Sequence, residues 1–235
     1  MATSEVGLWS SSWRISLAIA AKDFLAEYRT KEVFITMVVF GFMVAVIFSF
    51  AFEPTSQEAQ RMVGGLVWLV FFFSGILGLN RSFTRETVNE CLQGLRLAPA
   101  DAGAIYLGKL LSNLAFMLAA ELILLVPFAI LFDVHFWRDP LWLLVILGLG
   151  TWGFAALGTI FAAVSASTRM REFMLPLLVL PLCLPVLIVA VEATTRLLQG
   201  LPMSGNWPWI ALLVVCFDLF FTLLPWFIFE AVVEQ

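Results

Sequence analysis

Six apolar stretches, each long enough to cross a lipid bilayer, follow one another between positions 33 and 229, and short polar segments separate them. An α-helix rises about 1.5 Å per residue, so roughly 20 residues cover the roughly 30 Å hydrocarbon core of a bilayer. The expected spans are Val33–Phe52, Met62–Leu79, Ala104–Leu131, Leu141–Val164, Phe173–Val191 and Trp207–Phe229. The sequence therefore predicts an all-α membrane protein with six transmembrane helices.

The composition excludes a water-soluble protein of this length. The hydrophobic fraction is 62% and the mean hydropathy is +0.99, whereas soluble domains use about 45–50% apolar residues. Because no segment outside the spans is large enough to fold alone, we expect a single transmembrane domain over residues 1–235, with the six-helix bundle at 33–229. The expected surroundings are the lipid bilayer and partner proteins, with no nucleic acid.

The positions of lysine and arginine predict the orientation of the chain in the membrane. Three of them lie in the connections after the first, third and fifth spans: Arg61, Arg138 and Arg196. The other ten lie before the first span or around the connections after the second and fourth: Arg14, Lys22, Arg29, Lys31, Arg81, Arg85, Arg96, Lys109, Arg169 and Arg171. Since the cytoplasmic side of membrane proteins carries the excess of positive charge, we expect both termini in the cytoplasm.

Residues 1–32 form a cytoplasmic amphipathic segment in this reading. Its larger apolar side chains recur at steps of three and four residues: Trp13, Leu17, Phe24, Leu25 and Tyr28. Such a helix lies in the membrane interface with its apolar stripe toward lipid or toward the ends of the spans. It is either a simple surface anchor or an elbow helix that leads at an angle into the first span and packs on the side where an ATPase would dock.

The connection at 80–103 is the longest one expected in the cytoplasm. Its first half is charged, and its second half carries Leu92, Leu95 and Leu97 before Pro99. A short amphipathic helix that ends at Gly94 or Pro99 fits this pattern. Leucines exposed on a cytoplasmic loop indicate burial against something outside the membrane, either a partner protein or lipid headgroups.

No catalytic or nucleotide-binding set is present in the sequence. Residues 103–109 match the first seven positions of a phosphate-binding loop, but Leu110 stands where the loop needs a hydroxyl for Mg²⁺, and the segment runs into a membrane span. His135 is the single histidine, so no metal cluster or catalytic triad is expected. The aromatic residues beside His135 could pack on a porphyrin, although aromatic residues at a span boundary are expected in any case.

Polar residues inside the spans are the more informative feature, because an ionisable group in lipid costs several kcal/mol unless it faces protein, water or a partner. Lys109, Asn113 and Glu121 follow a slowly drifting stripe on the third span, and Asp218 lies at similar depth in the sixth. Lys109 could extend to the cytoplasmic edge, whereas Glu121 could not. Either these residues pair between helices, or they act in the translocation path or in switching between states.

Proline and small residues distinguish two further spans. Pro176, Pro181 and Pro185 each remove an intrahelical hydrogen bond from the fifth span, which predicts a bent helix that can flex. The fourth span carries small residues at 150, 153, 158 and 162, a pattern that allows close approach of another helix or self-association.

Three segments of this chain together resemble the haem exporter protein B (CcmB) family, the permease subunit of the cytochrome c maturation ABC complex. They are LNRSFTRETVNECLQGLRLAP (79–99), GTWGFAALGTIFAAVSASTRMRE (150–172) and LPLLVLPLCLP (175–185). The resemblance covers nearly the whole chain in the same order. It departs at Asn80, where some members have glutamate. It implies an ABC-2-like six-helix half-permease in the bacterial inner membrane, with the N-terminal segment as its elbow helix.

The resemblance also implies partners and roles. ATP would be bound only by an ATP-binding subunit, CcmA, and the haem-handling proteins CcmC, CcmD and CcmE and a second copy of this chain would complete the machine. Haem is the expected transported ligand, with no tightly bound cofactor. By position, the ATPase-coupling residues would be Arg85, Glu86, Glu90, Leu92, Leu95, Leu97 and Pro99, and Glu121 is the candidate functional carboxylate. A drug or polysaccharide permease, or a scaffold that transports nothing, are the alternatives.

Overall fold

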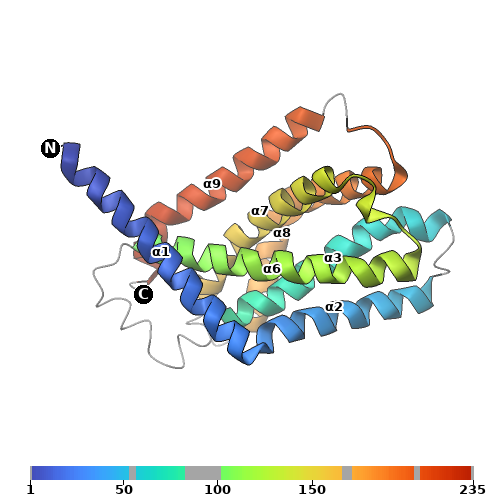
Figure 1. Ribbon diagram of the computed structural model, residues 1–235, viewed down its shortest axis with the longest axis horizontal. Helices are drawn as coiled ribbons and strands as arrows, with labels where there is room; N and C mark the ends of the chain where they lie inside the picture. The colour runs from blue at the N-terminus through green and yellow to red at the C-terminus, as the bar shows by residue number, and fades with distance from the viewer. Residues whose placement is uncertain (1, 53–56, 83–101, 166–170, 204–206, 234–235) are drawn as a thin grey trace.

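The computed structural model describes residues 2–52, 57–82, 102–165, 171–203 and 207–233. Within these ranges the chain is all-helical (Figure 1). The elements are α1 (Ala2–Thr30), α2 (Glu32–Ala51), α3 (Gln57–Ser82), α6 (Ala102–Phe132), the 3₁₀ turn η1 (Phe136–Arg138), α7 (Pro140–Ser165), α8 (Arg171–Gln199) and α9 (Trp207–Val233).

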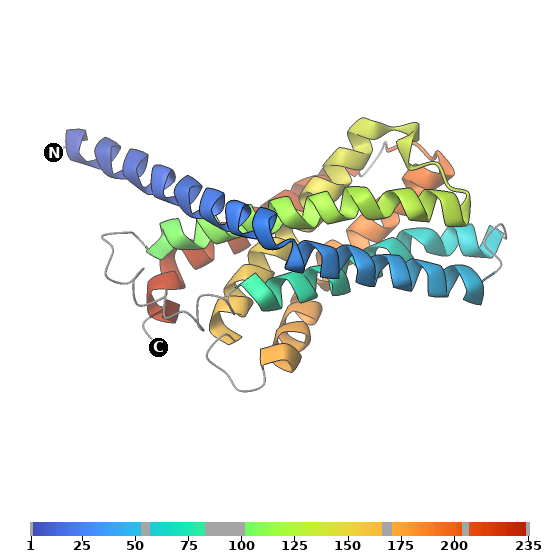
Figure 2. The ribbon, with the colours of Figure 1, turned by 60° about the horizontal axis from the view of Figure 1, so that its bottom comes forward.

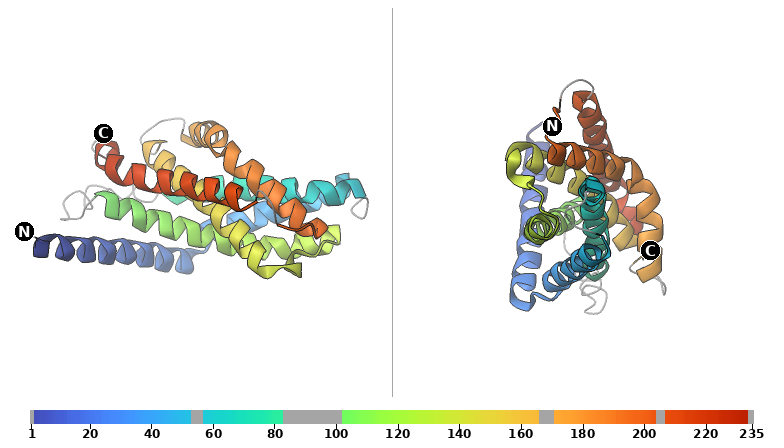
Figure 3. Two further views of the ribbon diagram at one scale, coloured as in Figure 1. Left: turned by 90° about the horizontal axis from the view of Figure 1, so that it is seen from above. Right: turned by 90° about the vertical axis from the view of Figure 1, so that its right-hand side faces the viewer.

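Six of these helices, α2, α3, α6, α7, α8 and α9, are long and apolar enough to cross a membrane, which confirms the number of spans expected from the sequence. α3 and α7 are the most buried of the six, while only 17% of α2 and 11% of α9 is buried inside the bundle. Figure 3 shows that the start of α1 and the end of α9 lie toward one end of the bundle, and that the connection from α6 to α7 lies toward the other.

The boundary expected at the end of the fifth span is wrong. Residues 192–206 were expected to be an outer connection that could hold one helical turn, supported by Glu192 and Arg196, but α8 continues to Gln199. The extra turns are favourable because Glu192 and Arg196 form an ion pair of 2.8 Å between positions i and i+4. Gly200 then ends the helix with a φ of 67°, a backbone conformation that glycine adopts without strain.

α1 and α2 are connected at Lys31, and hydrogen bonds hold this connection. Lys31 adopts the left-handed conformation, with φ 53°, and separates the two helices. The carboxylate oxygen Oε1 of Glu27 accepts hydrogen bonds from the backbone N–H groups of Val33, at 2.8 Å, and Phe34, at 2.9 Å. This buried carboxylate caps the first turn of α2, where a negative charge is also favoured by the helix dipole. The N-terminal helix is therefore confirmed as a helix, and its expected apolar stripe lies on the exposed side: Trp13, Leu17, Phe24, Leu25 and Tyr28.

Small residues on α7 allow the helices to pack closely in the interior. The ring of Trp68 lies directly against Gly150, and the side chain of Leu79 lies against Gly158, so a Cβ atom at either glycine would overlap its neighbour. Two groups of buried apolar residues result: one contains Tyr106 and Leu110, and the other Phe128 and Phe132. The close approach predicted for this span is therefore confirmed. α7 contacts α3, α6, α8 and α9.

Candidate functional site

Lys109 on α6 forms a buried ion pair with α1. Its Nζ atom lies 2.8 Å from Oδ2 of Asp23, and its side chain is 2% exposed. The sequence suggested that Lys109 could extend to the membrane edge, and it did not indicate Asp23 as the partner. The pair satisfies an ammonium group that would otherwise be costly to bury.

The later part of α1 packs against the first half of α6, and Figure 2 shows α1 crossing in front of that helix. The hydroxyl of Ser16 donates to the carbonyl of Ala104 at 2.9 Å. A Cβ atom at Gly108 would lie 2.7 Å from the carbonyl oxygen of Ser16, so only glycine permits this approach. Further along, the rings of Phe24 and Phe116 stack with centroids 5.1 Å apart. α1 and this half of α6 therefore form one packed unit.

Asn113 and Glu121 both face α7, as expected for neighbours on one stripe. The amide of Asn113 donates to the hydroxyl of Thr159 at 3.0 Å. The hydroxyl of Thr151 lies 2.7 and 2.9 Å from the two carboxylate oxygens of Glu121 and donates its proton to that group. Within the described residues, Thr151 is the only hydrogen-bond donor to the Glu121 carboxylate. Pairing between helices is therefore present, but a single donor leaves a buried carboxylate only partly satisfied.

The carboxylate of Asp218 on α9 has fewer hydrogen bonds than that of Glu121. Its side chain is 5% exposed, and neither carboxylate oxygen has a hydrogen-bond partner within the described residues. One oxygen lies directly against the Cα of Gly153 on α7, where a Cβ atom would collide with it. Buried polar groups without partners are rare in proteins. Asp218 therefore lies in the interior at a clear local cost in stability.

The three prolines of α8 do not interrupt the helix in the structure. α8 runs without a break through Pro176, Pro181 and Pro185. Each proline still lacks the N–H that an α-helix uses, so the backbone is less strongly held here than in the other spans. Flexing of α8 stays a prediction.

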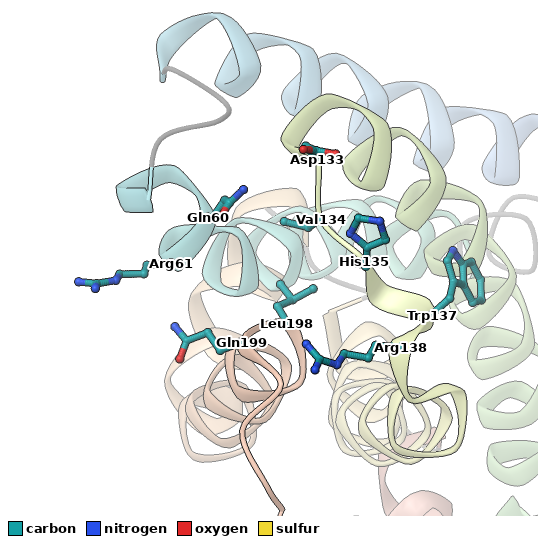
Figure 4. Close-up of a pocket in the computed structure, with 9 residues that line it drawn as sticks. All are labelled: Gln60, Arg61, Asp133, Val134, His135, Trp137, Arg138, Leu198 and Gln199. Carbon is teal, nitrogen blue, oxygen red and sulfur yellow. The ribbon is translucent and has the colours of Figure 1, made fainter.

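A cavity of about 1030 Å³ opens at the end of the bundle where α3 begins and where α6 and α8 end. Figure 4 shows that its residues come from three segments: the start of α3, the connection after α6, and the end of α8. The lining residues are Gln60, Arg61, Asp133, Val134, His135, Trp137, Arg138, Leu198 and Gln199. Among them are the single histidine of the chain and two arginines.

The connection after α6 alternates between buried and exposed side chains beside this cavity. Val134 and Phe136 are buried, whereas His135 and Trp137 are exposed. The connection begins at Asp133, with φ 49°, and the N–H of Val134 bonds to the carbonyl of Ala129 at 3.2 Å. Because the two buried residues anchor the segment, the imidazole and the indole are held at the cavity.

Arg138 lies across the end of α8. The N–H of Gly200 bonds to the carbonyl of Leu197 at 3.1 Å and that of Leu201 bonds to Arg196 at 3.0 Å, the pattern of a helix end closed by glycine. A Cβ atom at Gly200 would lie 2.5 Å from Nη1 of Arg138, so the missing side chain makes room for the guanidinium. The negative end of the helix dipole also favours a cation at this position.

The expected ATPase-coupling residues lie outside the described residues. They are Arg85, Glu86, Glu90, Leu92, Leu95, Leu97 and Pro99. Their roles stay predictions, but α6 begins at Ala102, directly after this segment.

Comparison with known proteins decides the family. The model of the CcmB protein family matches residues 14–234, almost the whole chain. The chain belongs to the CcmB family. This family provides the permease component for cytochrome c maturation, a bacterial membrane protein with no catalytic activity of its own.

Individual relatives can be aligned with this chain over most of their length, and each is described as heme exporter protein B. The protein of Pseudomonas aeruginosa is 32% identical over 196 residues, which cover 83% of this chain and 87% of the relative. That of Rhodobacter capsulatus is 31% identical over 192 residues, 80% of this chain and 85% of the relative. That of Escherichia coli K12 is 30% identical over 169 residues, 71% and 75% of the two chains.

Proposed function

We propose that this chain is the membrane half of an ATP-driven haem exporter. ATP hydrolysis by the partner CcmA would drive either the export of haem or the release of the haem-loaded chaperone CcmE. The relatives' description as haem exporters supports haem as the cargo. The six candidate spans support a permease that receives its energy from outside the membrane.

The observation that carries the proposal is the packed unit of α1 and α6. The segment proposed to contact CcmA runs directly into α6, and the first half of α6 is held to α1 by the Asp23–Lys109 ion pair. A displacement of that segment would therefore move α1 and α6 together. Since α6 also carries Glu121, which bonds to Thr151, the displacement would reach the interior of the bundle at α7.

The proposed arrangement is an ABC-2-like half-permease with both termini in the cytoplasm and α1 as its elbow helix. A second copy and the proteins CcmC and CcmD would cover apolar surface that one copy leaves open. The outer faces of α2 and α9 supply such surface, with exposed Phe42, Ile47, Leu213 and Leu219. In this orientation the large cavity faces the periplasm, the compartment of CcmE.

The contact with CcmA is tested by changing Leu92 and Leu95 to aspartate. The two leucines proposed to contact CcmA would be replaced by charged residues, so CcmA should be lost from the membrane fraction while this chain still inserts at normal levels. Thr84→Asp with Thr87→Asp is the matched control, because it adds the same charge to the same segment outside the leucine set. Co-purification of CcmA at normal yield with the leucine variant would contradict the assignment.

A further inference from the structure

We propose that the cavity at the ends of α3, α6 and α8 binds a flat aromatic ligand that carries carboxylates and a metal ion at its centre. Haem is the ligand of this class that the proposed function supplies, so the identity of the ligand rests on that function.

The charges of the cavity favour an anionic ligand. Arg61 and Arg138 line it, and neither has a carboxylate within 4.0 Å among the described residues. Asp133 is the single acid among the lining residues. A guanidinium binds a carboxylate through two parallel hydrogen bonds, which makes arginine the preferred residue for this group. Figure 4 shows Arg138 extending toward the end of α8 and Arg61 on the far rim, so the two cations can serve two separate carboxylates.

The remaining side chains favour a flat ring over a simple anion. Trp137 offers an indole face on which an aromatic ring can stack, and Val134 and Leu198 provide apolar contacts. The cavity volume of about 1030 Å³ is at the upper end of the roughly 300–1,000 Å³ typical of small-molecule sites. A phosphate or a lipid headgroup would use the arginines but would leave the indole and the apolar residues without a role.

His135 adds the capacity to bind a metal ion. It is exposed at the cavity, and no described residue hydrogen-bonds to its ring. A neutral imidazole nitrogen is a good ligand for iron. Because Val134 and Phe136 are anchored in the core, the ring is already positioned before the ligand arrives, which lowers the entropic cost of binding.

Titration of the purified full chain in detergent with hemin and with metal-free protoporphyrin IX tests this inference. His135→Ala should weaken hemin binding about tenfold and abolish the shift of the Soret band, because it removes the metal ligand. The same variant should bind metal-free protoporphyrin as the parent chain does. Arg138→Gln should weaken both ligands about tenfold, since it removes a charge-assisted contact to a carboxylate.

Arg196→Gln is the matched control, because Arg196 lies close by on α8 and is not a lining residue. It should change neither titration. If the His135 and Arg138 variants bind hemin as the parent chain does, or if phosphatidylglycerol vesicles displace it, the inference is wrong. Normal cytochrome c maturation by both cavity variants, together with loss of CcmA from the Leu92 and Leu95 variant, would overturn this inference and leave the proposed function standing. Impaired cytochrome c maturation in both cavity variants, together with normal retention of CcmA by the Leu92 and Leu95 variant, would overturn the proposed function alone.

Discussion

The ammonium group of Lys109 lies 2.8 Å from a carboxylate oxygen of Asp23 and joins the first half of α6 to α1. The lysine side chain is almost completely buried, and the aspartate is 16% exposed. The buried ammonium is tolerated because the carboxylate lies beside it, and the same carboxylate also has Lys22 at 3.3 Å. The ion pair therefore helps to hold α1 against the half of α6 that follows, in sequence, the segment proposed to receive CcmA.

Removing Asp23 alone should lower the stability more than removing both partners of this pair. Asp23→Asn removes the carboxylate that lies 2.8 Å from the buried ammonium of Lys109, and we expect it to lower the free energy of unfolding by about 3–5 kcal/mol. Lys109→Met should cost less, because Asp23 is partly exposed and keeps Lys22 at 3.3 Å. The double variant should recover much of that loss. Unfolding in an SDS titration measures the three values, and the exposed pair provides the control: Glu192→Gln should cost no more than about 1 kcal/mol. Additive losses in the double variant would show that the two residues are not coupled.

Gly108→Ala should separate α1 from α6. The new Cβ atom would lie 2.7 Å from the carbonyl oxygen of Ser16, and a backbone atom cannot move aside as a side chain does. We expect a loss of about 1–3 kcal/mol and faster proteolysis at Lys22 and Arg29. Gly148→Ala is the matched control, since nothing lies within 4 Å of its Cβ position and alanine favours a helix. Equal proteolysis of the two variants would mean that this contact is not tight in the membrane.

Gly153 and Asp218 should show coupled effects. Gly153→Ala pushes a methyl group into the Asp218 carboxylate, so we expect a loss of about 1–3 kcal/mol. Asp218→Ala alone should cost little, because the carboxylate has no hydrogen-bond partner in the described part of the chain. In the double variant the loss caused by alanine at 153 should largely disappear, and a double-mutant cycle measures this coupling. Independent effects would show that the two residues do not meet.

Glu121→Gln should lower the delivery of haem without preventing assembly of the complex. The amide oxygen of glutamine still accepts the hydroxyl of Thr151, so we expect the stability to change by no more than about 1 kcal/mol. Delivery of haem to the periplasm should fall, because an amide cannot bind and release a proton as a carboxyl group does. Thr151→Val serves as the control that removes the contact and keeps the carboxylate. Unchanged delivery, or failure of the complex to assemble, would assign Glu121 a structural role instead.

Span positions could be predicted from sequence because lipid imposes a length and an apolar composition on each helix. The first span was expected at Val33–Phe52 and lies at Glu32–Ala51. The end of α8 was missed for the opposite reason. The Glu192–Arg196 pair was expected to support one helical turn in the connection after Val191, but it supports a continuation of α8 outside the apolar region.

Contacts between distant segments could not be predicted. Lys109 was recognised as unusual, yet nothing in the sequence indicated Asp23 as its partner, since the two meet only when α1 folds onto α6. His135 and its aromatic neighbours were noticed together because they are adjacent in sequence. Arg61 and Gln199 join them in the cavity only because the ends of α3 and α8 lie beside that connection.

The most direct measurement is the ATP hydrolysis rate of CcmA reconstituted in liposomes with and without this chain. The account predicts that the chain changes the rate, and that Leu92→Asp with Leu95→Asp abolishes the change. A rate that is the same with the parent chain, the variant or no permease would contradict the central claim and leave a scaffold that couples nothing.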